Sequence, residues 1–294
     1  MESDLTDLRY LYRFGEYISD NELQIATFLN GLSKETIEQM AATYTEGYQK
    51  GFAVMGRDLS KKRTVGIRYE LGFERMIRAA IRKFAEMGLE SVIYRSAVWS
   101  VTQTPNRKIG YHGTSPNRQY DYDHRYDAAI YMDKAFKERK IAVLRTAYES
   151  YKKEAAMYAG PAVVETFGEA AFQPMNKAAA CALSRQQEEI SLAYMNESMS
   201  VINQYIPGDE TSFTIIAFPV PEIGKDFEEI FEETIRINTL DYGQYQEIQQ
   251  NIIEVLDQAE YVQVTGRGNN ETNLQIALHS LNDITKETNF ENCV

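Results

Sequence analysis

The strongest constraint on the fold is a short apolar run, FTIIAF (213–218), that lies between two turn signals. A helical pattern leads into the run and stops at IPG (206–208), and prolines at positions 219 and 221 end the run. A continuous stretch of β-branched and aromatic residues of this length is typical of a strand buried on both faces. Because helical patterns flank the strand, the sequence predicts an α/β fold with a mostly parallel sheet covered by helices.

The segment after this strand, FPVPEIG (218–224), is a candidate for one wall of a binding site. Proteins with α/β folds place their sites just beyond the carboxyl ends of the strands. The candidate cleft residues here are Phe218, Pro219, Pro221 and Glu222. The simpler interpretation is a rigid connection between a strand and a helix.

Residues 1–62 are predicted to form a helical N-terminal extension, since apolar residues recur there at helical spacing. The remainder, residues 63–294, is assigned to one α/β domain. It begins with a strand at Thr64–Tyr69, an amphipathic helix, and a second apolar run at Ser91–Tyr94. This βαβ unit implies parallel strands. The first turn has no G-x-G-x-x-G sequence, so a Rossmann dinucleotide site is not supported.

Two long helices are predicted in the middle of the chain, at Asp127–Ala159 and Met175–Tyr205. Two long helices in a row predict an antiparallel helical hairpin packed against the sheet. The linker between them carries Glu165 and Glu169. Paired carboxylates are able to act as general acid and base, although a solvated loop is the simpler interpretation.

The C-terminal part combines helical patterns with a β-hairpin. Apolar residues recur at helical spacing between residues 227 and 256. Two further strands are predicted at Tyr261–Thr265 and Leu274–Leu278, on either side of a GRGNN turn.

Residues 99–127 lose all periodicity, and a loop of this length inside a domain favours a functional role. The loop holds the candidate cleft residues His112, Asp123 and His124.

A metal cluster is one interpretation of Asp123, His124 and Asp127 in this loop. In the alternative interpretation, Asp121 or Asp123 caps the helix that follows, and Asp127 complements the helix dipole. Because no known ligand spacing is matched, no metal site is assigned to this chain.

The composition excludes several classes of partner. A net charge of −12 and a pI near 4.9 argue against binding to nucleic acid or to anionic membranes. Two cysteines, Cys181 and Cys293, are too few for a disulfide framework or a cysteine-based zinc site. The sequence shows no signal-peptide pattern and no apolar stretch near the ~20 residues of a membrane span. It therefore predicts a cytoplasmic protein without nucleic-acid or membrane partners.

Several longer stretches resemble one family of enzymes. They are RYELGFERMIRAAI (68–81), YAGPAVVETFGEAAF (158–172), YIPGDETSFTIIAFPVPEIG (205–224), INTLDYGQYQEIQQNII (237–253), and VTGRGNNETNLQIAL with ETNFENCV near the end of the chain. Over roughly residues 60–294 the chain resembles the N-terminal portion of clostridial-type leucyl aminopeptidases. These belong to the aminopeptidase S/T family of two-metal exopeptidases.

The resemblance implies an α/β N-terminal part, followed by a part that holds two divalent metal ions of the zinc or cobalt type. The first metal-ligating glutamate of the family follows the segment matched by ETNFENCV, so no metal ligand and no cofactor is carried over to this sequence. The implied full-length protein is a metal-dependent aminopeptidase that removes N-terminal residues from peptides, with a homodimer as a candidate assembly. This chain alone is expected to be inactive. The alternative is a stand-alone, non-catalytic binding or assembly module derived from the same family.

Overall fold

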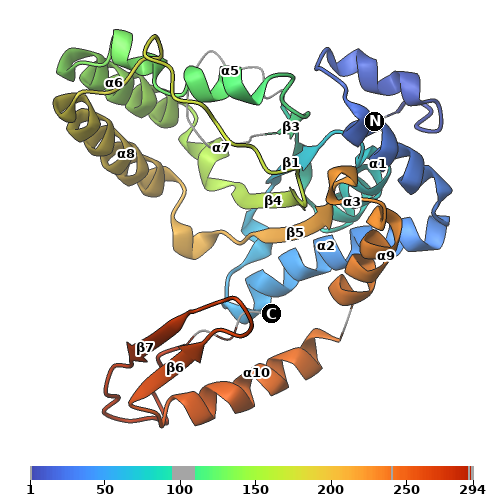
Figure 1. Ribbon diagram of the computed structural model, residues 1–294, viewed down its shortest axis with the longest axis vertical. Coiled ribbons are helices and arrows are strands. Elements are labelled where there is room, and N and C mark those ends of the chain that lie inside the picture. The colour runs from blue at the N-terminus through green and yellow to red at the C-terminus, as the bar shows by residue number, and fades with distance from the viewer. Residues whose placement is uncertain (1, 95–109, 240, 291, 293–294) are drawn as a thin grey trace. The chain divides into compact units, whose positions relative to one another are not determined.

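The computed structural model describes residues 2–94, 110–239, 241–290 and 292. The chain forms two compact units, Met1–Asn238 and Thr239–Val294 (Figure 1). Position 62, where the helical extension was expected to end, lies within the first unit. Helices from residues 1–62 share one apolar core with the sheet that follows them.

The first unit is built on a parallel sheet with the strand order β2-β1-β4-β5. A short strand, β3, pairs with the end of β1. Every pairing in this sheet is parallel, which confirms the predicted α/β fold. The strands are β1 (Thr64–Glu70), β2 (Glu90–Val92), β3 (Tyr111–His112), β4 (Tyr158–Phe167) and β5 (Thr214–Pro219).

Helices make up most of the rest of this unit. Side chains from α1, α2, α3 and α9 join those of β1, β4 and β5 in the apolar core. None of the helices in the described ranges has both the length and the apolar character that crossing a membrane requires. The α-helices of the first unit are α1 (Asp20–Gly31), α2 (Lys34–Val54), α3 (Glu74–Glu86), α5 (Arg118–Asp123), α6 (Lys134–Ser150), α7 (Lys152–Ala156), α8 (Arg185–Tyr205) and α9 (Phe227–Asn238). The 3-10 helices are η1 (Leu8–Phe14), η2 (Leu59–Lys61), η3 (Asp127–Ile130), η4 (Gly208–Glu210) and η5 (Pro221–Ile223).

Burial alternates along the strands, so one face of the sheet carries the core. In β1, alternate residues from Val65 to Tyr69 are fully buried. In β5, Ile216 and Phe218 are buried, whereas Ile215 is 54% exposed. The prediction that this strand is buried on both faces is therefore wrong. Along β5 the buried residues Ile216 and Phe218 lie on one face, and the residues between and before them are exposed or partly exposed.

The middle of the chain differs most from the prediction. The expected helix at 127–159 consists of η3, α6 and α7, and the chain then becomes β4, which lies between β1 and β5. The expected helix from Met175 begins only at Arg185, where Ser184 and Gln187 form a capping box. α6 and α8 do pack against each other, but a central strand separates them in the sequence.

Gly160 occupies a bulge in β4. Thr64 pairs with Tyr158 and Gly66 pairs with Pro161, so β4 uses three residue steps where β1 uses two. Gly160 has a φ of 113°, and a Cβ atom added there would lie 1.8 Å from the backbone oxygen of Ser212. Both the backbone conformation and the close approach therefore require glycine.

We expect Gly160→Ala to lower the free energy of unfolding by roughly 2 kcal/mol or more, through backbone strain and steric overlap combined. Gly56→Ala is the matched control, since Gly56 also has a positive φ, 64°, but a Cβ atom there would meet nothing within 4 Å. Its expected loss is about 1 kcal/mol. Urea denaturation measures both, and equal losses would show that the approach to Ser212 is unimportant.

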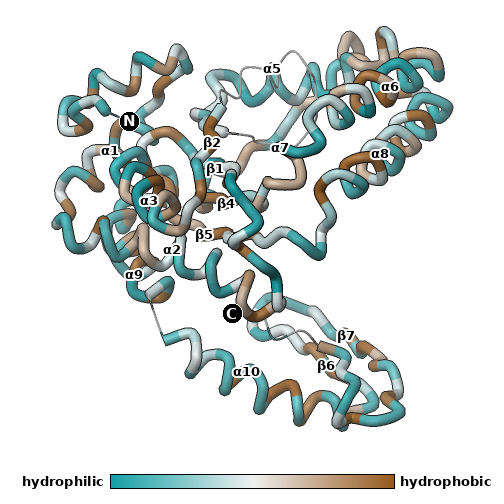
Figure 2. Tube along the Cα trace, turned by 180° about the vertical axis from the view of Figure 1, so that it is seen from behind, coloured by the Kyte–Doolittle hydropathy of each residue, from teal (hydrophilic) through white to brown (hydrophobic). Residues whose placement is uncertain are grey.

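The second unit contains a helix and a two-stranded antiparallel sheet. They are α10 (Tyr242–Leu256), β6 (Tyr261–Thr265) and β7 (Asn273–Ala277). The predicted hairpin is therefore confirmed. Brown segments recur along α10 in Figure 2, where its apolar residues lie.

Candidate functional site

Polar side chains from three strands converge at the carboxyl ends of the parallel sheet. Glu70 ends β1, His112 ends β3, and Thr166 lies one residue before the end of β4. The Thr166 hydroxyl lies 2.8 Å from Glu70 Oε2, and His112 Nε2 lies 3.8 Å from the same oxygen. Glu70 is only 6% exposed. Parallel strands bring their carboxyl ends to one edge, which explains why these residues meet.

A second carboxylate reaches the same hydroxyl. Glu169 follows β4, and its Oε1 lies 2.9 Å from Thr166 Oγ1. A hydroxyl carries one proton, so Thr166 donates to either Glu70 or Glu169 but not to both. A positively charged group that donates to both carboxylates would stabilise this pair.

Glu222 in η5 completes the edge of the site. Its Oε1 accepts from Asn21 Nδ2 at 3.0 Å. Its Oε2 accepts from the amide of Ala170 at 2.6 Å and from Arg118 Nη2 at 3.0 Å. The Ala170 amide, together with Asn21 and Arg118, holds the pKa of Glu222 below its ordinary value. We call Glu70, His112, Arg118, Thr166, Glu169 and Glu222 the carboxyl-edge site.

The loop after β3 is held near this site by a buried carboxylate. Glu22 is fully buried and accepts from the amide and hydroxyl of Ser19, each at 2.6 Å, and from the amide of Thr114 at 2.5 Å. Burial alone would raise the pKa of Glu22, but these hydrogen bonds outweigh it and the pKa is lowered. An ionised Glu22 thus joins the start of α1 to the residues that follow His112.

Two of the predicted cleft residues, His112 and Glu222, belong to this site. Two others lie at the far end of α5, where Asp123 pairs with Lys177 at 2.7 Å and His124 Nδ1 contacts Asp127 Oδ2 at 2.7 Å. Residues 99–109 of the predicted loop lie outside the described residues, and the rest of the loop, from residue 110 onward, is described.

The helix caps in this region also differ from the prediction. Neither Asp121 nor Asp123 caps the helical segment that follows residue 127, and Asn117 caps the short helix α5, because its side chain accepts from the Tyr120 amide. Asp133 caps α6 in the same way. The predicted capping aspartates instead lie within α5 itself.

The remaining predicted residues come from the end of β5. Phe218 is fully buried and stacks on Phe231, with ring centroids 4.9 Å apart. Pro219 is buried as well, and Pro221 opens η5 with part of its surface accessible. The contribution of this segment to the surface therefore comes from Pro221 and Glu222.

Sequence reasoning did not single out Glu70, Thr166 or Arg118. Glu70 and Thr166 each lie at or next to a strand end, and that position was the available signal. Arg118 opens a six-residue helix whose existence the sequence pattern did not indicate.

The donor set does not fit the two-metal centre that the family resemblance implies. Among the residues that the structure describes, no three His, Cys, Asp or Glu side chains gather to hold a metal ion. His112 with Glu70, and His124 with Asp127, are pairs only. A two-metal centre needs several ligands for each ion.

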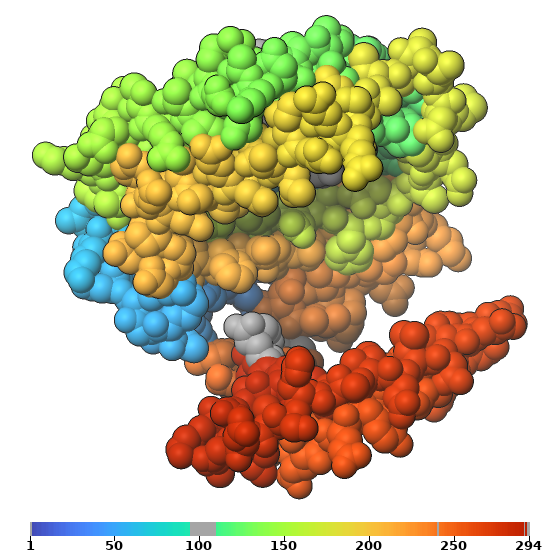
Figure 3. Space-filling view, turned by 90° about the vertical axis from the view of Figure 1, so that its left-hand side faces the viewer, coloured from blue at the N-terminus to red at the C-terminus, as the bar shows by residue number. Residues whose placement is uncertain are grey.

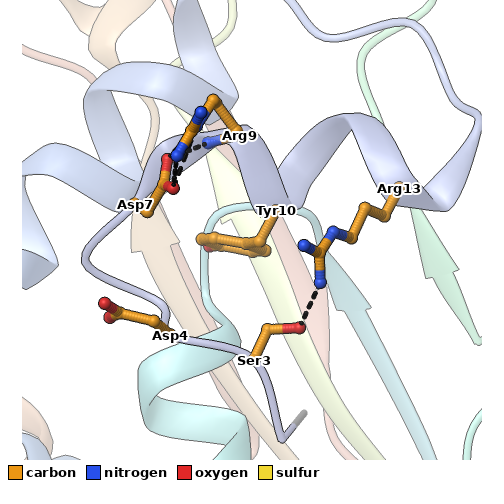
Figure 4. A pocket seen from close by; sticks show the side chains of 6 residues that line it. All are labelled: Ser3, Asp4, Asp7, Arg9, Tyr10 and Arg13. Carbon is orange, nitrogen blue, oxygen red and sulfur yellow. Dashed lines mark hydrogen bonds and ion pairs between the residues drawn. The ribbon is translucent and has the colours of Figure 1, made fainter.

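A separate recess of about 320 Å³ lies beside η1 and is lined by polar side chains (Figure 4). Its arginines already have polar partners, since Arg9 pairs with Asp7 at 2.5 Å and Arg13 donates to Ser3 at 3.0 Å. Tyr10 forms part of the wall and donates its hydroxyl proton inward to buried Glu74. The hydrogen bond from Tyr10 to Glu74 attaches the N-terminal segment to α3.

Comparison of the sequence with models of known protein families and with curated proteins gave no match.

Proposed function

We propose that this chain is the non-metal-binding part of a metal-dependent aminopeptidase, and that its carboxyl-edge site forms one wall of the peptide cleft. One observation carries the proposal. Three of the stretches that resemble the aminopeptidase S/T family each contribute to this site: residues 68–81 contribute Glu70, residues 158–172 contribute Thr166 and Glu169, and residues 205–224 contribute Glu222.

The chemistry of the site suits the amino terminus of a peptide. A terminal ammonium group has three donors and a positive charge, and it needs acceptors that are ionised or strongly polar. Glu70, Glu169 and Thr166 present such oxygens within one small region. Arg118 keeps a guanidinium at the same edge, where it is able to donate to a carbonyl group.

In this proposal the chain's own residues bind and orient the peptide. The two metal ions of the family would polarise the scissile carbonyl and supply the attacking hydroxide, and the family's separate metal-binding part would hold them. The two cysteines, which are too few for a disulfide framework, support a cytoplasmic location for this activity.

The first test is aminopeptidase activity on leucine p-nitroanilide. It is measured with the complete gene product, which in this proposal joins this chain to the metal-binding part. Glu169→Gln is expected to raise KM about tenfold and to leave kcat nearly unchanged, because the carboxylate contributes to binding rather than to bond cleavage. Glu165→Gln is the matched control, since Glu165 is an exposed glutamate on β4, the strand that Glu169 follows.

Absence of activity in the complete, metal-loaded gene product would overturn the proposed function. An unchanged KM in Glu169→Gln would remove the carboxyl-edge site from substrate binding but would leave the aminopeptidase assignment standing. The alternative of a non-catalytic peptide-binding module predicts that this chain binds peptides while the complete gene product hydrolyses none.

A further inference from the structure

Residues 168–184 connect β4 to α8 by an unusual path. From residue 168 to residue 177 they form no helix, strand, turn or bend. Phe172 is 41% exposed and Met175 is 66% exposed, so apolar burial does little to hold the segment. It runs past α5 as the yellow segment of Figure 1 and lies at the surface in Figure 3. We call residues 170–177 the strap.

The side chain of Gln119 contacts the strap main chain at two points. Gln119 Nε2 donates to the carbonyl oxygen of Met175 at 2.8 Å, and Gln119 Oε1 accepts from the Met175 amide at 2.9 Å. Nε2 also donates to Asp123 Oδ1 at 2.6 Å, which orients the amide. Both polar groups of one strap residue are thus recognised by one side chain.

A second strap residue is recognised in the same manner. The amide of Ala170 donates to Glu222 Oε2 at 2.6 Å, and the carbonyl oxygen of Ala170 accepts from Arg118 Nη1 at 2.7 Å. Arg118 and Glu222 also pair with each other at 3.0 Å. Ala170 offers only a methyl side chain, so this contact depends on the strap's backbone rather than on its sequence.

The far end of the strap adds a contact that selects a side chain. Lys177 Nζ lies 2.7 Å from Asp123 Oδ2, and Tyr122 donates to Asn176 Oδ1 at 2.8 Å. Lys177 and Gln119 lower the pKa of Asp123, which keeps its carboxylate charged. Asp123 therefore provides a position for a basic residue.

Recognition of main-chain N–H and C=O groups at intervals is how proteins bind extended peptides irrespective of most of their sequence. We propose that Arg118, Gln119, Asp123 and Glu222 form a peptide-binding surface, that the strap occupies it from within the chain, and that an extended peptide with a basic residue displaces the strap. The inference rests on the proposed function in that this peptide would be its substrate. Glu222 and Arg118 join the surface to the carboxyl-edge site.

The strap competes with any added peptide because it is tethered. A tethered segment acts at a high effective concentration, so the free surface is a minor state and the apparent affinity for an added peptide is reduced in proportion. Loosening the strap without altering the surface should therefore increase peptide affinity.

Met175→Pro loosens the strap, because proline has no amide hydrogen to donate to Gln119 Oε1. Met175→Ala is the matched control, since it shortens an exposed side chain and keeps the amide. The probe is a fluorescein-labelled peptide with the sequence EAAFQPMNKA, which reproduces residues 169–178. Fluorescence anisotropy is expected to show about fivefold tighter binding to Met175→Pro than to Met175→Ala. Adding Gln119→Ala to Met175→Pro should remove most of that gain.

Equal affinities of the two Met175 variants for the probe would overturn the inference, and so would a gain that survives Gln119→Ala. The proposed function is tested separately by the activity of the complete gene product. Peptide binding by this chain with no hydrolysis by the complete product would retain the surface and reject the aminopeptidase. Suppose instead that the complete product hydrolyses the substrate with the same KM in Met175→Pro and Met175→Ala, and that the two variants bind the probe equally. That result would retain the aminopeptidase and reject the peptide-binding surface.

Discussion

Phe231→Ala is expected to lower the free energy of unfolding by about 4 kcal/mol, the largest effect of any single substitution proposed for this chain. Phe231 lies in α9 and is fully buried. Its ring stacks on Phe218 of β5 at 4.9 Å and lies 6.1 Å from the ring of Phe73 at the start of α3. Truncation would leave a cavity where α9, the sheet and α3 meet, and three elements would lose aromatic contacts at once.

Phe213→Ala is the matched control, because Phe213 is 61% exposed just before β5. It should cost about 0.5 kcal/mol or less. Guanidinium denaturation, followed by far-UV circular dichroism, gives both values. Similar losses for the two variants would contradict the arrangement of α9 against the sheet.

Glu74→Gln is expected to stabilise the protein by about 3 kcal/mol above pH 7 and to have little effect below pH 4.5. Glu74 is the first residue of α3 and is fully buried. Its Oε2 accepts from the Tyr10 hydroxyl at 2.6 Å and from the Gly72 amide at 2.9 Å. Burial raises the pKa of Glu74 to about 7, although these hydrogen bonds partly oppose the rise.

The direction of the pH dependence follows from the raised pKa. The folded chain holds the Glu74 proton up to about pH 7, whereas the unfolded chain releases it near the ordinary value of 4.5. The contribution of Glu74 to the free energy of unfolding therefore falls as the pH rises from 4.5 to 7. Over this range the unfolded chain gains stability by releasing the proton, whereas the folded chain still holds it. Glutamine is neutral at every pH, and its amide oxygen is able to keep the two hydrogen bonds that Oε2 accepts.

Thermal or urea unfolding of wild type and Glu74→Gln between pH 4 and pH 8 measures this difference. Glu86→Gln, at an exposed position on the same helix, is the control and should follow the wild-type profile. A constant difference between Glu74→Gln and wild type over this pH range would show that Glu74 does not titrate there.

Local patterns were sufficient to predict several elements. The strand at 64–69, the amphipathic α3 and the hairpin of β6 and β7 are all present. In each of them the periodicity of apolar residues and the bounding turn residues lie within a short window, so no information from distant residues is needed.

β4 shows where local reasoning fails. Gly160-Pro161 suggests the end of a helix, yet here it belongs to a bulge in the central strand. The small residues Ala159 and Ala162 carry little intrinsic preference for a strand. Their conformation is fixed because β1 and β5 pair with β4 on either side and supply partners for its backbone groups.

The site divides in the same way. The rule that α/β proteins place sites beyond the strands was enough to select Glu222 from the sequence, and the loss of periodicity over residues 99–127 selected His112. The contact between Thr166 and Glu70 joins residues 96 positions apart, and no sequence spacing indicates it. It exists because parallel pairing of β1 with β4 brings their carboxyl ends to one edge. The sequence by itself determined which segments become strands and helices where the pattern is local, and only the tertiary structure decided which polar side chains meet, since strand order rather than chain order sets their distances.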